Sequence, residues 1–164
     1  MTAPAEHMLA ILEAEREIYR TFVHFFHLVD TRQYERVAEE CFTPHAEIEY
    51  HVPNLHRFSG RDAFTGYLLA HVESRSQMVA HVIGQRVIHW NNGQPHLEAY
   101  ATVWHWHTAH AMKGVLRPAD WTTIGHVADD FERVNGQWLI ARRIVTPVGG
   151  LVAAGRTPAP GTSA

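Results

Sequence analysis

The chain has 164 residues, 46% of them hydrophobic and 19% charged, with a formal net charge of −3. This length and composition are typical of one globular domain and exclude a disordered or fibrous protein. No basic stripe suits nucleic acid, no apolar run approaches the roughly 20 residues that cross a bilayer, and the single cysteine excludes an internal disulfide framework. We therefore expect a cytoplasmic protein that binds neither nucleic acid nor membrane.

The first half of the chain favours helices. Apolar residues recur at helical spacing over residues 8–29 and predict an amphipathic helix. A second helix follows DTRQ at 30–33 and ends before Pro44, which cannot continue a helix. The next segments are expected to form a strand, a loop and a third helix, over 46–52 (AEIEYHV), 53–60 (PNLHRFSG) and 60–74 (GRDAFTGYLLAHVES).

The second half of the chain favours strands. Asn-Gly pairs in WNNGQP and RVNGQW supply the positive φ angles of tight hairpin turns. Helices followed by hairpins indicate an α+β fold, with the helices on one face of a curved antiparallel sheet. We expect one domain over 1–148 and a flexible tail over 149–164, which is rich in Gly, Pro and small residues. The predicted strands are 78–90, 96–109, 121–134 and 137–146.

Asp30 is the first candidate for chemistry. It occupies the helical position after Phe26, at the end of the apolar stripe that enters the core. Asp30 with Gln33 also matches a capping box at the start of the second helix. If the carboxylate is buried instead, it needs a partner, and an imidazole bonded to it would be oriented as a general base. The chain has 14 histidines, and the candidate partners are His81, His105 and His107.

A second candidate site is the strand ATVWHWH. Residues two apart in a strand share a face, so His105 and His107 lie beside Ala101 and Val103, whose small side chains leave room for a ligand. The two rings could instead simply fill a sheet face, or bind a metal together with His81 or Glu49. No cysteine pair or His-Glu-x-x-His motif supports a metal site. We expect acid–base chemistry on a small molecule, without metal or cofactor.

The tryptophans of the same strand point to self-association. Trp104 and Trp106 share the face opposite the histidines and are too apolar to remain in water. We expect them to pack on a second subunit or on the third helix, and we expect a homodimer or homotrimer.

Several segments carry a resemblance to a known family: HLVDTRQYERV, PHAEIEYHV, QMVAHVIGQRVIHW, AYATVWHWH, TTIGHVADDFERVNGQW and ARRIVTP. With the order of helices and strands, they resemble the SnoaL-like branch of the nuclear transport factor 2-like superfamily over roughly residues 8–148. Within that branch they are most similar to the scytalone dehydratases. The resemblance implies a cone-shaped α+β barrel, with a curved sheet wrapped around the N-terminal helices and a deep pocket at the open end.

The resemblance also implies roles for individual residues. Asp30 would orient His81 as a catalytic base, and His107, seven residues after Tyr100, would be a second catalytic histidine. Tyr50 would position a water on the substrate carbonyl. The implied function is that of a cofactor-independent dehydratase, a lyase, acting on a cyclic or polyketide-like hydroxy-carbonyl compound. A polyketide cyclase, an isomerase and a non-catalytic binding module remain alternatives, because fold alone does not define the reaction.

The chain departs from the dehydratases at positions that contact substrate. Val29 replaces a tyrosine that holds water, while Asp129 and Phe131 stand where the dehydratases have a serine and an asparagine. These differences predict a different substrate. The expected substrate contacts are Tyr50, Tyr100, His105, Asp129 and Phe131.

Overall fold

A computed structural model describes residues 3–51, 54–111 and 116–152. The helices precede the long strands, as expected, and none of the helices described is long and apolar enough to cross a membrane. The helices are α1 (Ala3–Asp30), α2 (Tyr34–Cys41) and α3 (Arg61–Tyr67), the last continued by a π-helical turn (Leu68–Glu73). The strands are β1 (Phe42–Tyr50), β2 (His56–Ser59), β3 (Ser76–Asn91), β4 (Gln94–His107), β5 (Trp121–Val134) and β6 (Gln137–Val152), and a 3-10 turn (Thr108–His110) follows β4.

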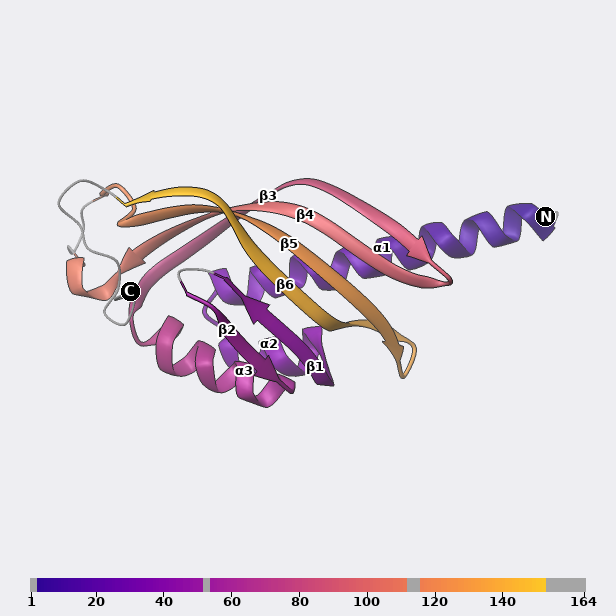
Figure 1. Ribbon diagram of the computed structural model, residues 1–164, viewed down its shortest axis with the longest axis horizontal. Coiled ribbons are helices and arrows are strands. Elements are labelled where there is room, and N and C mark those ends of the chain that lie inside the picture. The colour runs from indigo at the N-terminus through magenta and orange to yellow at the C-terminus, as the bar shows by residue number, and fades with distance from the viewer. Residues whose placement is uncertain (1–2, 52–53, 112–115, 153–164) are drawn as a thin grey trace.

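The strands form one curved, unclosed sheet in the order β2-β1-β6-β5-β4-β3. Figure 1 shows the helices on the concave side of this sheet, with the N-terminal end of α1 extending past the tip of the β3–β4 hairpin. The predicted α+β class is confirmed. The sheet is mixed rather than purely antiparallel, because β1 runs parallel to β6.

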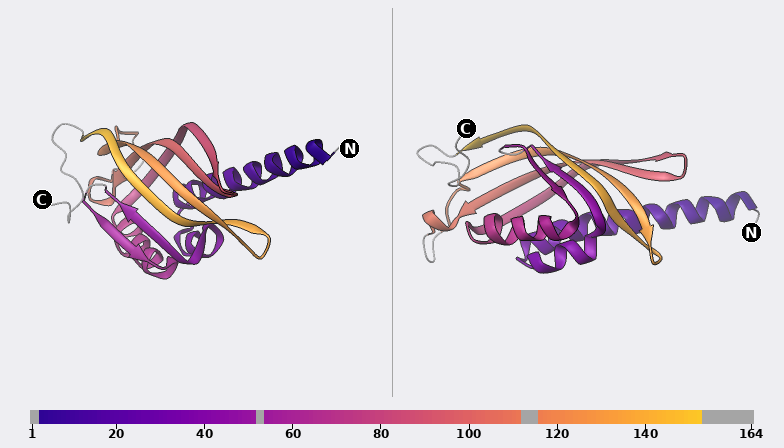
Figure 2. Two further views of the ribbon diagram at one scale, coloured as in Figure 1. Left: turned by 45° about the vertical axis from the view of Figure 1, so that its right-hand side comes forward. Right: turned by 60° about the horizontal axis from the view of Figure 1, so that its bottom comes forward.

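Two local predictions differ from the structure. The expected loop at 53–60 contains β2, which pairs with β1 and follows it closely in Figure 2. The sequence of β2 is short and polar, so it does not indicate a strand. Only the side chains of His56 and Phe58 are partly buried, and those of the residues between and after them are exposed. The last strand also runs past 146, where Gly150 pairs with Thr123. A Cβ at Gly150 would lie 2.6 Å from the Thr122 carbonyl oxygen, so this glycine permits a close strand approach. The rest of the predicted tail, 153–164, lies outside the described residues.

The hairpin predictions are confirmed by backbone angles. Asn92 and Gly93 connect β3 to β4 with φ of 52° and 82°, and Asn135 and Gly136 connect β5 to β6 with φ of 50° and 85°. Positive φ at both central residues gives the turn a twist that matches the strands it joins. These turns set the strand registers, and hence which side chains of β4 and β5 face the helices.

A buried ion pair lies in the core between the sheet and α1. Asp129 on β5 and Arg143 on β6 are directly paired across the sheet, and neither is exposed. Arg143 donates from Nε at 2.8 Å and from Nη2 at 2.6 Å to the two carboxylate oxygens. Its guanidinium lies 4.0 Å from the ring centre of Phe25 on α1. The pair thus joins both central strands to the first helix.

Replacing Asp129 should destabilise the fold strongly. Asp129→Ala would leave a buried cation without its counter-charge, so the free energy of unfolding should fall by about 3–5 kcal/mol. Urea denaturation measures this change. Asp130→Ala is the matched control, because Asp130 is partly exposed and so are its partners His96 at 2.6 Å and Arg142 at 3.6 Å, which predicts a loss of about 1 kcal/mol or less. Equal losses in the two variants would contradict the role given to the buried pair.

Candidate active site

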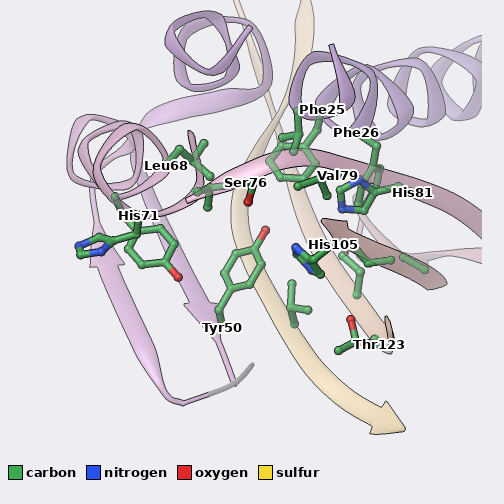
Figure 3. Close-up of a pocket in the computed structure, with 18 of the residues that line it drawn as sticks. Phe25, Phe26, Tyr50, Leu68, His71, Ser76, Val79, His81, His105 and Thr123 are labelled. Atoms are coloured by element: carbon green, nitrogen blue, oxygen red, sulfur yellow. The ribbon is translucent and has the colours of Figure 1, made fainter. Parts of the chain in front are cut away.

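A cavity of about 190 Å³ opens between α1, the π-helical turn and the concave face of the sheet. Most of its wall is aromatic or aliphatic, as is common for sites that bind small molecules. Figure 3 shows Tyr50, His81 and His105 reaching into this space from different strands. The polar side chains of its wall include Tyr50, His81, His105, His107, Thr123 and Arg143.

The Asp30 carboxylate holds His81 at the wall of this cavity. Its Oδ1 lies 2.6 Å from Nδ1 of the ring, and its Oδ2 accepts the backbone N–H of His81 at 3.1 Å. The ionised carboxylate selects the tautomer with a proton on Nδ1, which leaves Nε2 with a free electron pair. The capping alternative is wrong, since α2 begins after Gln33 and has no side-chain cap.

The turn after α1 is fixed from two sides. Arg32, in a left-handed conformation with φ of 60°, donates to the carbonyl oxygens of Ser76 at 2.5 Å and Glu73 at 3.2 Å. These bonds tie the turn to the start of β3, five residues before His81. The position of Asp30 is therefore restrained twice. The turn that follows it is bonded to the start of β3, and its own carboxylate is bonded to His81 on the same strand.

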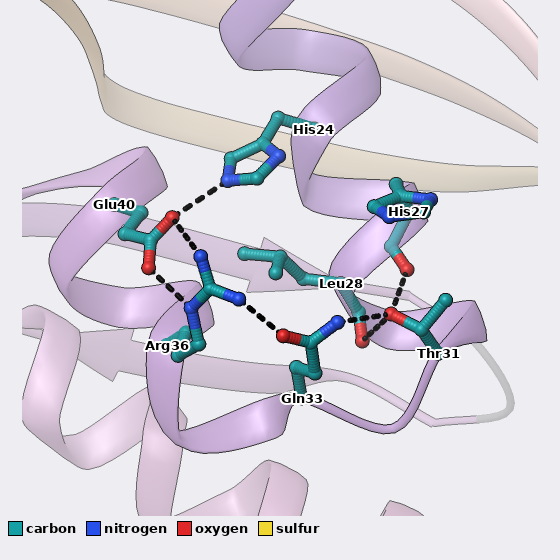
Figure 4. A network of polar contacts seen from close by, with 7 residues as sticks. All are labelled: His24, His27, Leu28, Thr31, Gln33, Arg36 and Glu40. Atoms are coloured by element: carbon teal, nitrogen blue, oxygen red, sulfur yellow. Dashed lines mark hydrogen bonds and ion pairs between the residues drawn. The ribbon is translucent and has the colours of Figure 1, made fainter.

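A second polar network joins α1 to α2, as Figure 4 shows. The Glu40 carboxylate accepts from Arg36 at 2.5 Å and lies 2.7 Å from the His24 ring. Bonding to Arg36 and His24 lowers the pKa of Glu40. Gln33, the predicted capping partner, instead contacts Arg36 and donates to Thr31 at 2.8 Å. Exposed pairs like these add little stability but restrict the geometry of the turn.

His105 and His107 of β4 both line the cavity, as the alternation predicts. His105 stacks on Trp121 with ring centres 4.8 Å apart. Burial, and then the nearby His81 and His107, lower the pKa of His105 to about 3. His107 is 6% exposed, and neither of its ring nitrogens has a hydrogen-bond partner among the described residues. Burial also lowers the pKa of His107, against the opposing effect of the Asp120 carboxylate. Both rings are therefore neutral near pH 7.

The proposed metal alternative gains no support from the geometry. Across the part of the chain that the structure describes, no three His, Cys, Asp or Glu side chains are arranged to hold a metal ion. Glu49, which could have completed such a site, instead accepts from Arg57 at 2.8 Å and contacts His51.

Two donors lie near one another on a different wall of the cavity. Tyr50 stacks on Phe64, and burial raises the pKa of its hydroxyl despite the neighbouring Arg143, so the phenol keeps its proton. Arg143 also lines the cavity, and its fully buried guanidinium interacts with the Tyr50 hydroxyl through charge and hydrogen bonding. Tyr50 can therefore donate to an oxygen of a bound molecule, and the buried Arg143 cation beside it favours negative charge on that oxygen.

Sequence reasoning missed Arg143. The segments ADDF and ARRI each contain two identical charged residues in a row. Neighbouring residues on a strand point to opposite faces of the sheet, so one residue of each pair points inward. One aspartate and one arginine are thus directed into the core, where each needs the other as its counter-charge, because a buried charge without a partner is strongly destabilising.

Three predicted substrate contacts, Tyr100, Asp129 and Phe131, lie away from the cavity, so these predictions are wrong. Tyr100 is 43% exposed on the convex face, where its ring packs against His126. Tyr100 precedes Ala101, which faces inward, and successive side chains on a strand point to opposite faces, so Tyr100 faces outward. The Asp129 carboxylate is paired with Arg143, and Phe131 is 1% exposed within the core. None of the three borders the cavity.

The model of the SnoaL-like domain matches residues 10–144. No curated protein sequence matches the chain significantly. A solved structure of a provisionally assigned scytalone dehydratase from Novosphingobium aromaticivorans superposes with a TM-score of 0.72 and 19% identity, covering 94% of this chain and 99% of that one.

Two further solved structures share the fold. ActVI-ORFA from Streptomyces coelicolor has a TM-score of 0.67 and 22% identity, covering 82% of this chain and 96% of its own. A type 2 hexachlorocyclohexane dehydrochlorinase, LinA, has a TM-score of 0.71 and 14% identity, covering 94% of this chain and 97% of its own. At these identities the likeness shows a common fold.

The neutral state of His105 should make stability depend on pH. Its pKa is lowered to about 3 in the folded chain, so between that value and the ordinary value near 6.5 only the unfolded chain binds this proton. Stability should therefore fall as the pH drops from about 6.5, by about 1 kcal/mol per pH unit for this group. Urea denaturation of the wild type and His105→Phe at several pH values measures the difference. Identical slopes in the two proteins would contradict the burial of a neutral ring.

Proposed function

Because the chain belongs to the SnoaL-like domain family, we propose that it is a cofactor-independent lyase of the dehydratase kind. Its substrate is a cyclic or polyketide-like compound that carries a hydroxyl group and a carbonyl group. The observation that carries this proposal is the contact between Asp30 and Nδ1 of His81 at 2.6 Å, beside an apolar cavity. Such a pair is a general base whose ring orientation and tautomer are already set.

The reaction begins with proton removal beside the substrate carbonyl. Nε2 of His81 takes this proton, and Asp30 stabilises the imidazolium that forms. The developing enolate oxygen accepts a hydrogen bond from the Tyr50 hydroxyl, and the neighbouring Arg143 cation stabilises its negative charge. Donors that are already in place and shielded from water stabilise such a charge effectively, because they need no reorganisation during the reaction.

Loss of water completes the reaction. The enolate reforms the carbonyl, the new carbon–carbon double bond forms, and the bond to the hydroxyl group breaks. His81 returns its proton to the departing hydroxide, so that water leaves and the base is restored. His107 is neutral and contributes an N–H hydrogen bond to the leaving oxygen rather than a whole proton, because burial lowers its pKa.

The Asp30–His81 pair should be essential for turnover. Asp30→Asn and His81→Ala should each lower the dehydration rate by about 10²- to 10⁴-fold, the usual contribution of a positioned acid–base group. The assay follows loss of one water by mass spectrometry across a panel of cyclic hydroxy-ketones. A product of unchanged mass would indicate an isomerase or cyclase that uses the same base.

The chain offers a matched control for this test. Asp130 contacts Nδ1 of His96 at the same distance of 2.6 Å, but away from the cavity. Asp130→Asn should therefore leave turnover unchanged. Wild-type rates in Asp30→Asn and His81→Ala would remove the pair from the mechanism.

We further propose that a second copy of the chain covers the convex face of the sheet. Met78, Val82, Tyr100 and Ile124 are exposed there, and the strand registers place Val82 and Ile124 on either side of Thr102. Trp104 lies on the same face and is partly buried. Exposed apolar side chains grouped on one sheet face are typical of subunit contacts, and a homodimer or homotrimer would cover them.

A charge at the centre of this face should separate the subunits. We expect the wild type to sediment as a dimer or trimer, and Val82→Glu to sediment as a monomer, because the interface would have to bury the new carboxylate. Leu12→Glu, at an exposed position of α1 on the other side of the sheet, is the control and should stay associated. A monomeric wild type would end this proposal.

A further inference from the structure

His105 is the pocket histidine to which the mechanism assigns no step. It extends from β4 into the cavity, and Figure 3 shows its ring directed toward the space between Tyr50 and His81. It lies near enough to His81 and His107 for positive charge on either ring to lower the pKa of His105. A substrate that contacts both the base and the oxyanion donors must therefore pass close to this ring.

Trp121 fixes the orientation of the His105 ring. The two residues are directly paired across β4 and β5, and their rings lie 4.8 Å apart with planes 23° from parallel. Trp121 itself borders the cavity. Rotation of the imidazole would break this stacking, so the ring nitrogens are presented to the cavity in a defined direction.

Both ring nitrogens are available to a ligand. Within the described parts of the chain, neither forms a hydrogen bond, and the Trp121 contact involves only the ring face. Because the ring is neutral, it offers one N–H donor and one acceptor nitrogen. A molecule in the cavity with matching polar groups can therefore form hydrogen bonds with this ring.

We propose that His105 is a specificity-determining residue that hydrogen-bonds a second oxygen of the substrate ring, near the carbon that His81 deprotonates. The proposal rests on the function given above for the identity of the base. It defines the substrate class more narrowly, as a ring compound with at least two oxygen functions. One oxygen lies at Tyr50 and Arg143, and the other, a hydroxyl or a ketone oxygen, lies at His105.

The oxygen at His105 is uncharged. A carboxylate there would favour a protonated imidazole, which burial and the neighbouring His81 and His107 all oppose. A hydroxyl group instead matches the neutral ring, since it can donate to the unprotonated ring nitrogen or accept from the ring N–H.

Binding of matched probes tests this inference without requiring turnover. Tetralone is a rigid two-ring ketone, and its ring-hydroxylated derivatives add one oxygen at different places. Titration calorimetry near pH 7 should show at least one derivative binding the wild type about 5- to 10-fold more tightly than tetralone itself, as expected for one net hydrogen bond. If no hydroxylated derivative binds more tightly than tetralone, the proposal is overturned.

Two variants separate hydrogen bonding from packing. His105→Phe keeps an aromatic ring against Trp121 but no nitrogen, so the preference should disappear while the affinity for tetralone stays within about twofold. His105→Gln keeps an N–H donor and a carbonyl acceptor and should restore part of the preference. A preference that survives in His105→Phe would overturn the assignment.

The outcomes also distinguish this inference from the proposed function. If Asp30→Asn keeps full turnover while His105→Phe loses the binding preference, the base is wrong and His105 still selects the ligand. If Asp30→Asn loses turnover while His105→Phe binds every probe as the wild type does, the base stands and the role of His105 is refuted.

Discussion

The contact between Asp30 and His81 is the constraint around which the domain is organised. It joins the last residue of α1 to the middle of β3 through the ring and the backbone of one residue. To make it, α1 must end at the sheet, and the chain must turn back at once. The left-handed Arg32 and its bonds to the carbonyl groups of Ser76 and Glu73 provide that turn. The helix, the turn and the strand are thus positioned together, and the cavity lies where they meet.

The histidines of this chain show how surroundings assign different chemistry to one side chain. His81 is bound to a carboxylate, which suits a base that must carry a transient positive charge. Burial of His105 and His107 lowers the pKa of both rings, which suits hydrogen bonding without proton uptake. His96 has a carboxylate partner at the same distance as His81 but lies away from the cavity. An Asp–His pair therefore becomes a candidate catalytic group only through the space beside it.

The buried ion pair links stability to the proposed chemistry. Taking Asp129 and Arg143 out of water is costly, and their two mutual hydrogen bonds offset that cost. The same pairing leaves Nη1 of Arg143 directed away from Asp129 in a residue that borders the cavity. Tyr50 lies beside it and keeps its proton. A charge that the core must neutralise for folding is thereby also placed to stabilise an anionic oxygen.

The sequence by itself determined the elements that depend on local physics. Helical spacing defined α1, Asn-Gly pairs defined two hairpins, and alternation along β4 placed His105 and His107 on one face. It could name Asp30 as a candidate, but a capping role remained equally consistent with the local pattern. Only the tertiary structure decided that Asp30 binds His81, that Tyr100 faces outward, and that Arg143 rather than Asp129 borders the cavity. These outcomes depend on the register and curvature of strands far apart in the chain, which no local pattern encodes.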